Sequence, residues 1–235
     1  MTINSLLTAL DEVKYLLSEA DVLKYENSSR ARSIVNAKLS AEFLSIMHSD
    51  DYDNIYKTAM KNNDFDFVLI DDSFIQFSAI KGENELVAGK IRFAYFPNPR
   101  SYQTYHEFLE ENGFSYDEVG DELAEVYEQY ISEAKLKNFV TPIRYDYDYR
   151  SYDMTNHSVS HLHIGREENV RIPLSKMLSP QAFTVLIIKY LYLEHWKKAI
   201  LKDSFKNIFE KSKQKCVALD NELFSEFEKL QLYLC

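Results

Sequence analysis

The spacing of apolar residues predicts helices at both ends of the chain. Leucine and valine recur every three or four positions over residues 4–24, which predicts an amphipathic helix capped by Asn4. Ser179 supplies a cap and Pro180 a first-turn proline for a later helix. The same periodicity predicts the remaining helices, so the expected terminal set covers residues 4–24, 29–47, 51–61, 179–198, 199–215 and 219–233.

The middle of the chain changes to the two-residue alternation that is typical of strands. Strands are predicted over residues 67–70, 73–80, 85–96, 140–149, 158–164 and 169–174. Two helices, 101–112 and 115–136, interrupt the series and are separated by Asn112-Gly113. This order predicts an α+β fold, with an antiparallel sheet of about five to six strands flanked by N-terminal and C-terminal helices.

A chain of 235 residues fits a single domain. Its expected parts are N-terminal helices (1–62), a sheet with inserted helices (63–178) and C-terminal helices (179–235). Two cysteines are too few for a disulfide scaffold, and there is no CxxC pair. The N-terminus is not a signal peptide and no apolar run reaches 18 residues, so we expect a cytoplasmic protein without a membrane partner.

Charge is unevenly distributed along the chain. The net charge of −10 argues against indiscriminate binding to polyanions. Residues 1–150 carry 15 Lys and Arg against 27 Asp and Glu, whereas residues 151–235 carry 12 against 10. The C-terminal third therefore stays a candidate face for RNA or DNA. The acidic helix over 107–133 is a candidate for docking a basic protein partner.

The densest group of reactive side chains lies between residues 141 and 180. Alternation places Tyr145 and Leu162 on the face that packs against helices. The opposite face then collects polar side chains from three strands. These are the candidate site residues: Arg144, Asp146, Asp148, His161, His163 and Arg171, with Gln76, Ser78 and Arg92 as additions from earlier strands.

This face supports two kinds of chemistry. In the first, one of His161 and His163 accepts a proton, the other donates one, and Arg144 and Arg171 stabilise phosphate charge. In the second, the two imidazoles and a carboxylate of Asp146 or Asp148 hold a divalent metal.

Other interpretations compete with these. Asp146 with Arg144 or Arg171 can instead form cross-strand salt bridges on a solvated sheet. His157 is expected to be a loop residue, and His195 to pack on a helix face. The chain has no P-loop, GxGxxG, GxSxG or HExxH motif, which argues against ATP-driven, Rossmann-type and serine hydrolase functions.

The segment 140–195 resembles the DUF2290 family, bacterial proteins of unknown function. An Arg- and Asp-rich strand at Arg144 and Asp146 is followed by the pattern HxxxHxH, a hydrophobic residue and Gly. An Arg-Ile-Pro strand and a Ser-Pro helix start come next, with Met177-Leu178 in place of the usual Pro-Leu. The remaining matched positions are His157, His161, His163, Gly165, Arg171, Ile172, Pro173, Ser179 and Pro180. The resemblance implies a bacterial, cytosolic protein and supplies no activity.

The residues and the resemblance together lead to two functional hypotheses. The first is a phosphodiesterase, a nuclease of bacterial defence or toxin type, that acts on RNA or DNA through the HxH strand with Asp and Arg. The second is a non-catalytic module of a bacterial defence complex, which senses a ligand or binds a protein through its acidic helices.

Overall fold

The computed structural model divides into two compact units, Met1–Pro97 with Thr141–Cys235 and, between them in sequence, Asn98–Val140. The structure describes residues 1–30, 34–35, 38–49, 51–84, 86–137, 139–167 and 169–234. No helix within these ranges is both long and apolar enough to span a membrane.

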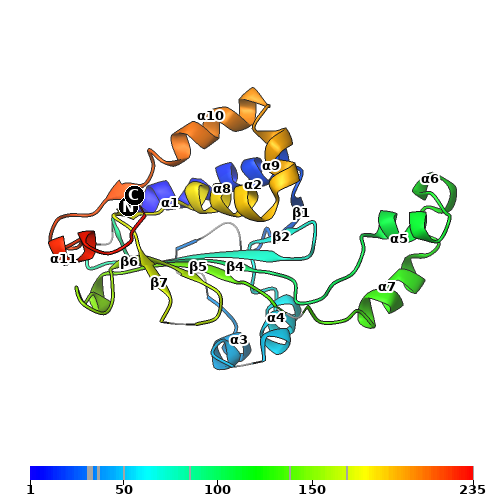
Figure 1. Cartoon of the computed structure of the whole chain (residues 1–235), viewed down its shortest axis with the longest axis horizontal. Helices are drawn as coiled ribbons and strands as arrows, with labels where there is room; N and C mark the ends of the chain where they lie inside the picture. The colour runs from blue at the N-terminus through cyan, green and yellow to red at the C-terminus, as the bar shows by residue number, and fades with distance from the viewer. Residues whose placement is uncertain are drawn as a thin grey trace. The chain divides into compact units, whose positions relative to one another are not determined.

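The larger unit is built on one antiparallel sheet whose seven strands lie in chain order (Figure 1). The α+β prediction is confirmed, with one strand more than the six expected. The strands are β1 (Leu23–Glu26), β2 (Phe67–Leu69), β3 (Phe74–Lys81), β4 (Ala88–Phe96), β5 (Ile143–Asp148), β6 (Ser160–Ile164) and β7 (Arg171–Pro173).

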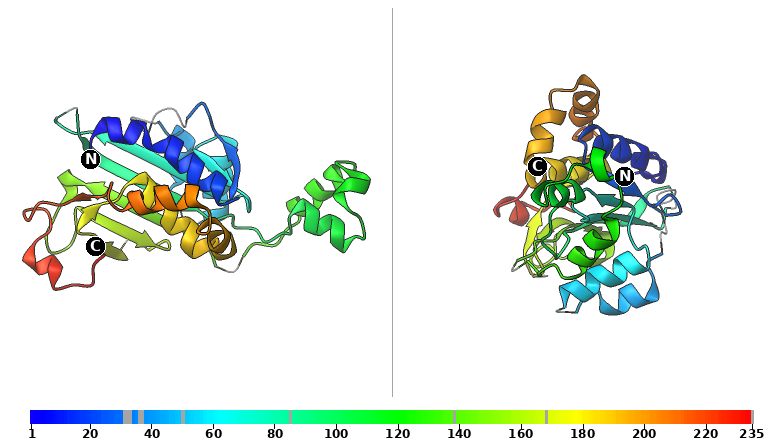
Figure 2. Two further views of the ribbon diagram at one scale, coloured as in Figure 1. Left: turned by 90° about the horizontal axis from the view of Figure 1, so that it is seen from above. Right: turned by 90° about the vertical axis from the view of Figure 1, so that its right-hand side faces the viewer.

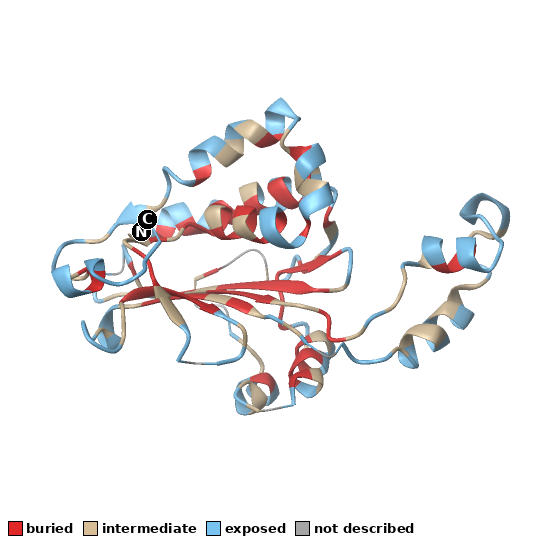
Figure 3. Cartoon of the chain, viewed as in Figure 1, coloured by how far each residue is buried: buried red, intermediate tan, exposed pale blue. Residues whose placement is uncertain are grey.

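One face of the sheet is covered by helices from both ends of the chain (Figures 1 and 2). They are α1 (Ile3–Leu7), α2 (Ala9–Glu19), α8 (Pro180–Leu191), α9 (Leu193–Ala199) and α10 (Asp203–Ser212). Phe93 on β4 links the layers, because its ring lies 5.1 Å from Phe77 and 5.8 Å from Phe183 of α8. The strands and the helix faces that meet them are buried (Figure 3). As predicted, Ser179 caps α8 by accepting a hydrogen bond from the Ala182 amide.

The opposite face carries two helices, α3 (Ala41–Ile46) and α4 (Tyr52–Lys61) (Figure 1). Their aromatic contacts concentrate at one end of β3 and β4: the Phe96 ring lies 4.7 Å from Phe74 and 6.0 Å from Phe43 of α3. Tyr56 of α4 also meets Phe74 at 5.6 Å. On the same face, polar side chains of β4 to β7 form a pocket that is described below.

Several helix predictions were wrong in extent, including the one over 115–136, which is α6 and α7. The helix over 4–24 is two helices that meet at Thr8, whose hydroxyl bonds back to the Asn4 carbonyl, followed by β1. Within the described part of 29–47 only α3 is helical. β2 is too short to cover the far half of β3, and Ile34 accepts a hydrogen bond from Ala79 at that open edge.

The helix over 219–233 shrinks to α11 (Glu226–Lys229). Its flanks are held in extended pairings instead: the Leu219 amide bonds to Ser175 and the Leu234 amide to Pro173. A small second sheet pairs β8 (Lys176–Met177) with β9 (Val217–Ala218). The long helix over 179–198 is likewise broken at Tyr192, between α8 and α9.

The smaller unit contains α5 (Tyr105–Glu111), α6 (Tyr116–Val119) and α7 (Ala124–Ser132). Aromatic rings hold these helices together, with Tyr127 lying 5.1 Å from Tyr105 and 5.3 Å from Phe108. Residues 98–140 carry 10 acidic and 3 basic side chains, so this unit contains most of the excess negative charge. Its role in docking a basic partner stays a prediction.

Candidate functional site

Strand register brings the predicted polar residues together on the sheet face that carries α3 and α4. Across β5 and β6, Asp146 pairs with His161 and Arg144 with His163. On the outer strand β7, Arg171 pairs with His163. From β4, Lys90 and Arg92 pair with Asp148 and Asp146. These side chains line a pocket of about 190 Å³, here called the central pocket. Its lining residues are His48, Lys90, Arg92, Arg144, Asp146, Asp148, Ser151, His157, His161, His163 and Arg171.

All six residues singled out from the sequence line the central pocket, and Arg92 from the earlier strands joins them. Gln76 and Ser78 do not. The Gln76 amide donates to the Asp64 carbonyl, and the Ser78 hydroxyl lies 3.4 Å from the Arg92 carbonyl. The convergence of side chains is therefore a structural fact, while their roles stay predictions.

Asp146 is the anionic centre of the pocket, with 7% of its surface exposed. Arg92 donates from Nε to Oδ1 over 2.9 Å, and Arg144 donates from Nε to Oδ2 over 2.7 Å. Burial alone would raise the pKa of Asp146, but the charges and hydrogen bonds of Arg92 and Arg144 outweigh it and lower the pKa. The predicted salt bridge of Asp146 with Arg144 is therefore present, and Arg92 forms a second one.

His161 and His163 are almost fully buried, at 1% and 3% exposure, with ring centroids 4.8 Å apart. The His161 Nδ1 lies 2.7 Å from the Ser158 carbonyl oxygen. Because a carbonyl only accepts, Nδ1 carries the proton and Nε2 keeps a lone pair. The His163 Nε2 lies 3.5 Å from Asp146 Oδ2, whereas its Nδ1 is buried and has no hydrogen-bond partner within the described ranges.

The environment keeps both imidazoles neutral near pH 7. Burial lowers the pKa of His161 to about 4. Burial, followed by the positive charge of Arg144, lowers the pKa of His163 to about 3. A neutral imidazole can accept a proton or bind a metal, so both kinds of chemistry expected from the sequence remain open to these side chains.

Sequence reasoning missed several members of the pocket, above all His157. A tight turn, in which Asp153 and His157 exchange two backbone hydrogen bonds, brings the His157 ring to 4.8 Å from His161. The His157 Nδ1 is also buried, with no hydrogen-bond partner in the described part of the chain. The HxxxHxH spacing was the available signal, but strand alternation cannot place a residue in a turn. Lys90, His48 and Ser151 carried no signal.

The charge of the pocket favours an anionic ligand. The described lining contains four cationic side chains and two carboxylates, in a chain with a net charge of −10. Lys90 lies 2.8 Å from Asp148, and Asp146 pairs with two arginines. The fourth cation is Arg171, whose buried Nε has no hydrogen-bond partner among the described residues. A buried N–H without a partner is costly, and an anion would satisfy it.

A metal also has candidate ligands here. One ligand atom each from Asp146, His161 and His163 lies within 4.8 Å of the others. Both Asp146 oxygens already accept hydrogen bonds from arginines, however. The arginines that lower the pKa of His163 would oppose a divalent cation through the same repulsion. The geometry therefore permits a metal, while the charges disfavour it.

Comparison with known proteins assigns the family. The family model DUF2290, described as an uncharacterized conserved protein, matches residues 16–233. The chain belongs to the DUF2290 family. Neither the curated proteins nor the solved structures gave a match to this DUF2290 chain. The family description contains no activity, so a nuclease, defence or toxin role stays a prediction.

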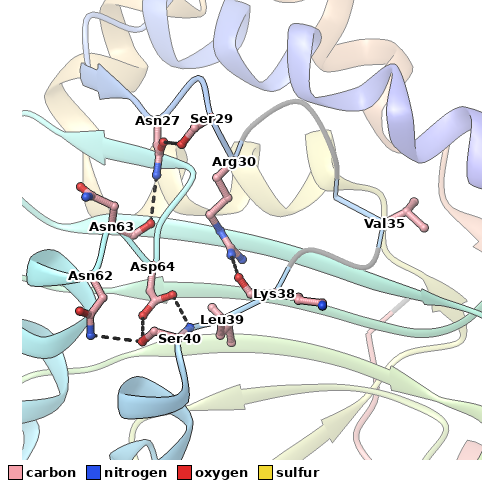
Figure 4. Close-up of a pocket in the computed structure, with 10 residues that line it drawn as sticks. All are labelled: Asn27, Ser29, Arg30, Val35, Lys38, Leu39, Ser40, Asn62, Asn63 and Asp64. Atoms are coloured by element: carbon pink, nitrogen blue, oxygen red, sulfur yellow. Dashed lines mark hydrogen bonds between the residues drawn. The ribbon is translucent and has the colours of Figure 1, made fainter.

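The DUF2290 chain has a second, larger pocket of about 610 Å³ beside β1 and β2, with different chemistry (Figure 4). Its polar groups largely bond to one another: Ser40 donates to Asp64, and Arg30 donates to the Lys38 carbonyl. Asn27 donates to the Asn63 carbonyl over 3.0 Å. None of its described lining residues is a histidine. The central pocket is therefore the stronger candidate for proton-transfer chemistry.

Proposed function

We propose that this chain cleaves phosphodiester bonds in RNA or DNA, with His161 and His163 as its proton-transfer groups. The observation that carries the proposal is a buried histidine pair inside a pocket with excess positive charge. At about 190 Å³ the pocket is smaller than the 300–1,000 Å³ typical of sites that enclose a whole ligand. That size suits one phosphate group of a longer molecule.

The proposed reaction is an attack by water on the bound phosphorus. Arg171 and Arg144 bind the non-bridging oxygens and stabilise the charge that develops on them. The Nε2 of His161 accepts a proton from the attacking water, since its Nδ1–H is held by the Ser158 carbonyl. A new P–O bond forms to the water oxygen, and the P–O bond to the leaving oxygen breaks.

His163 is the proposed proton donor to the leaving oxygen. Burial and then the arginines around it keep its pKa low, but a bound phosphate brings negative charge that offsets the arginines and raises the pKa. Asp146, 3.5 Å from the His163 Nε2, is a positioning residue for this ring. The histidines thus act directly, because the arginines oppose a divalent cation at the same place.

Hydrolysis of bis(p-nitrophenyl) phosphate tests the proposed reaction. The purified chain should release p-nitrophenol, and EDTA should leave the rate unchanged, because no step requires a metal. Release that appears only after addition of Zn²⁺, Mn²⁺ or Mg²⁺ would assign the histidines to metal binding instead. Absence of hydrolysis of this diester and of labelled RNA and DNA, with and without metals, would contradict the proposed function.

A further inference from the structure

Two further pockets share lining residues with the central pocket. A pocket of about 790 Å³, the Arg166 pocket, shares His48 and Arg144 with it. A pocket of about 600 Å³, the Arg150 pocket, shares Lys90 and Asp148 with it. The three pockets follow one another through shared lining residues, with the histidines in the middle one, and together they are here called the groove.

The groove follows strand β5 along its length. Pro142, just before β5, lines the Arg166 pocket, and Asp148 to Arg150, at the end of β5, line the Arg150 pocket. The six residues of β5 span roughly 17 Å at about 3.4 Å per residue. If the nucleotides of a single strand stack about 3.4 Å apart, about five of them fit over this length.

The groove has a local excess of positive charge, although the chain as a whole is acidic. Its described lining contains four carboxylates, Glu83, Asp146, Asp148 and Glu167. It contains seven basic side chains, Lys81, Lys90, Arg92, Arg144, Arg150, Arg166 and Arg171. Basic side chains along a groove bind a phosphate backbone by releasing its counterions.

Aromatic rings lie in both flanking pockets. Tyr149 lines the Arg150 pocket and exposes 59% of its surface. Phe96 lines the Arg166 pocket and is partly exposed, with its ring also stacked on Phe74. Arg166 is fixed there by a hydrogen bond of 2.6 Å to the Ser49 carbonyl and lies 5.8 Å from the Tyr52 ring centroid. Aromatic faces and cations arranged along one groove are typical of proteins that bind single strands.

We infer that the groove binds a single strand of nucleic acid lengthwise along β5, and that the central pocket receives a phosphodiester from the interior of that strand. The inference rests on the proposed function and names its substrate. A flexible single strand can bend one phosphate toward histidines that are 1% and 3% exposed, whereas a rigid duplex cannot. Pockets on both sides provide room for nucleotides before and after the cleaved bond, so a free end is unnecessary.

Binding is measured with fluorescein-labelled RNA and DNA oligonucleotides of about 12 nucleotides, within the usual range of single-strand sites. The His161→Gln/His163→Gln variant serves as the background, so that cleavage does not interfere. Arg150→Ala and Arg166→Ala should each weaken binding about fivefold and reduce the salt slope by about 0.7 per lost phosphate contact. Lys211→Ala is the matched control, because this exposed lysine lies on α10, on the opposite side of the sheet from α3 and α4 (Figure 1).

Two outcomes would overturn the inference: unchanged affinity in both groove variants, or duplex binding as tight as single-strand binding. Circular single-stranded DNA tests whether the central pocket receives an interior phosphodiester, because a circle has no free end. The wild-type chain should cut it. Cleavage of linear strands alone would contradict this part of the inference. Diester hydrolysis without groove-dependent strand binding would remove this inference and leave the proposed function. Groove-dependent strand binding without any hydrolysis would remove the proposed function and leave only the strand-binding part of the inference.

Discussion

Replacing the two buried histidines of the central pocket, His161→Gln/His163→Gln, should reduce phosphodiester cleavage by roughly a thousandfold. General acid–base groups typically contribute 10²- to 10⁴-fold, and the two rings act in one reaction, so their losses should not add. Glutamine keeps a hydrogen-bonding group but cannot exchange protons near neutral pH. His195→Gln is the matched control, because His195 lies outside the pocket lining and its Nδ1 is 3.0 Å from the Ala20 carbonyl.

The same variant should also lose part of the acid sensitivity of the fold. The pKa values of His161 and His163, about 4 and about 3, lie below the usual 6.5, so the unfolded chain binds more protons than the folded chain as pH falls below 6.5. The contribution of the two neutral imidazoles to the free energy of unfolding is therefore complete above pH 6.5. It is lost on acidification toward pH 4, and for His161 this loss is on the order of 3 kcal/mol.

Urea unfolding at pH 7 and pH 4.5 measures this difference. The pKa of Asp66, raised to about 6 by burial, acts in the opposite direction over the same range. The wild-type chain must therefore be compared with the variant at each pH, because that difference cancels the contribution of Asp66. An equal pH response in both proteins would mean that the two imidazoles are not neutral in the fold, and full cleavage by the variant would exclude them from the chemistry.

Arg171→Met should lower cleavage by about 10²- to 10³-fold, as loss of one preorganised donor does, while the free energy of unfolding stays unchanged or increases. The reason is that the buried Arg171 Nε has no hydrogen-bond partner in the part of the chain that the structure describes, so its removal breaks no hydrogen bond at that atom. A side chain that lowers the stability of the fold but is needed for activity is typical of a ligand-binding group.

Arg92→Met is the matched comparison, since Arg92 bonds to Asp146 and is about one-quarter exposed. Its loss should destabilise the fold by about 1–3 kcal/mol by leaving a buried carboxylate less compensated. Cleavage rates and urea midpoints of the two variants separate the roles. If Arg171→Met were as destabilising as Arg92→Met and fully active, Arg171 would be a structural residue.

Much of the site was predictable because strand alternation fixes which side chains share a face. Once Tyr145 and Leu162 face the helices, Asp146 and His161 must face away, and the structure has them paired across β5 and β6. The interval of three residues between His161 and Ser158 gave no hint of the hydrogen bond that sets the tautomer, since it depends on how the chain turns before β6.

Other parts depended on contacts that the sequence does not encode locally. Lys90 and Arg92 reach the pocket because β4 pairs with β5, although residues 98–140 separate the two strands in sequence. Local patterns do not specify which distant strands pair. His157 lies in a turn, where alternation has no meaning. The predicted helix over 29–47 had good apolar spacing, but the open edge of β3 offered Ile34 a backbone hydrogen bond instead.

The most direct test of the account is a crystal structure of the chain grown with inorganic phosphate. The account predicts a phosphate in the central pocket, with oxygens about 3 Å from the Arg171 Nε and from an imidazole nitrogen of His161 or His163. That position would join the unpartnered donor to the proton-transfer groups. A structure in which phosphate binds only elsewhere, or in which a metal ion occupies the space between Asp146 and the histidines, would contradict it.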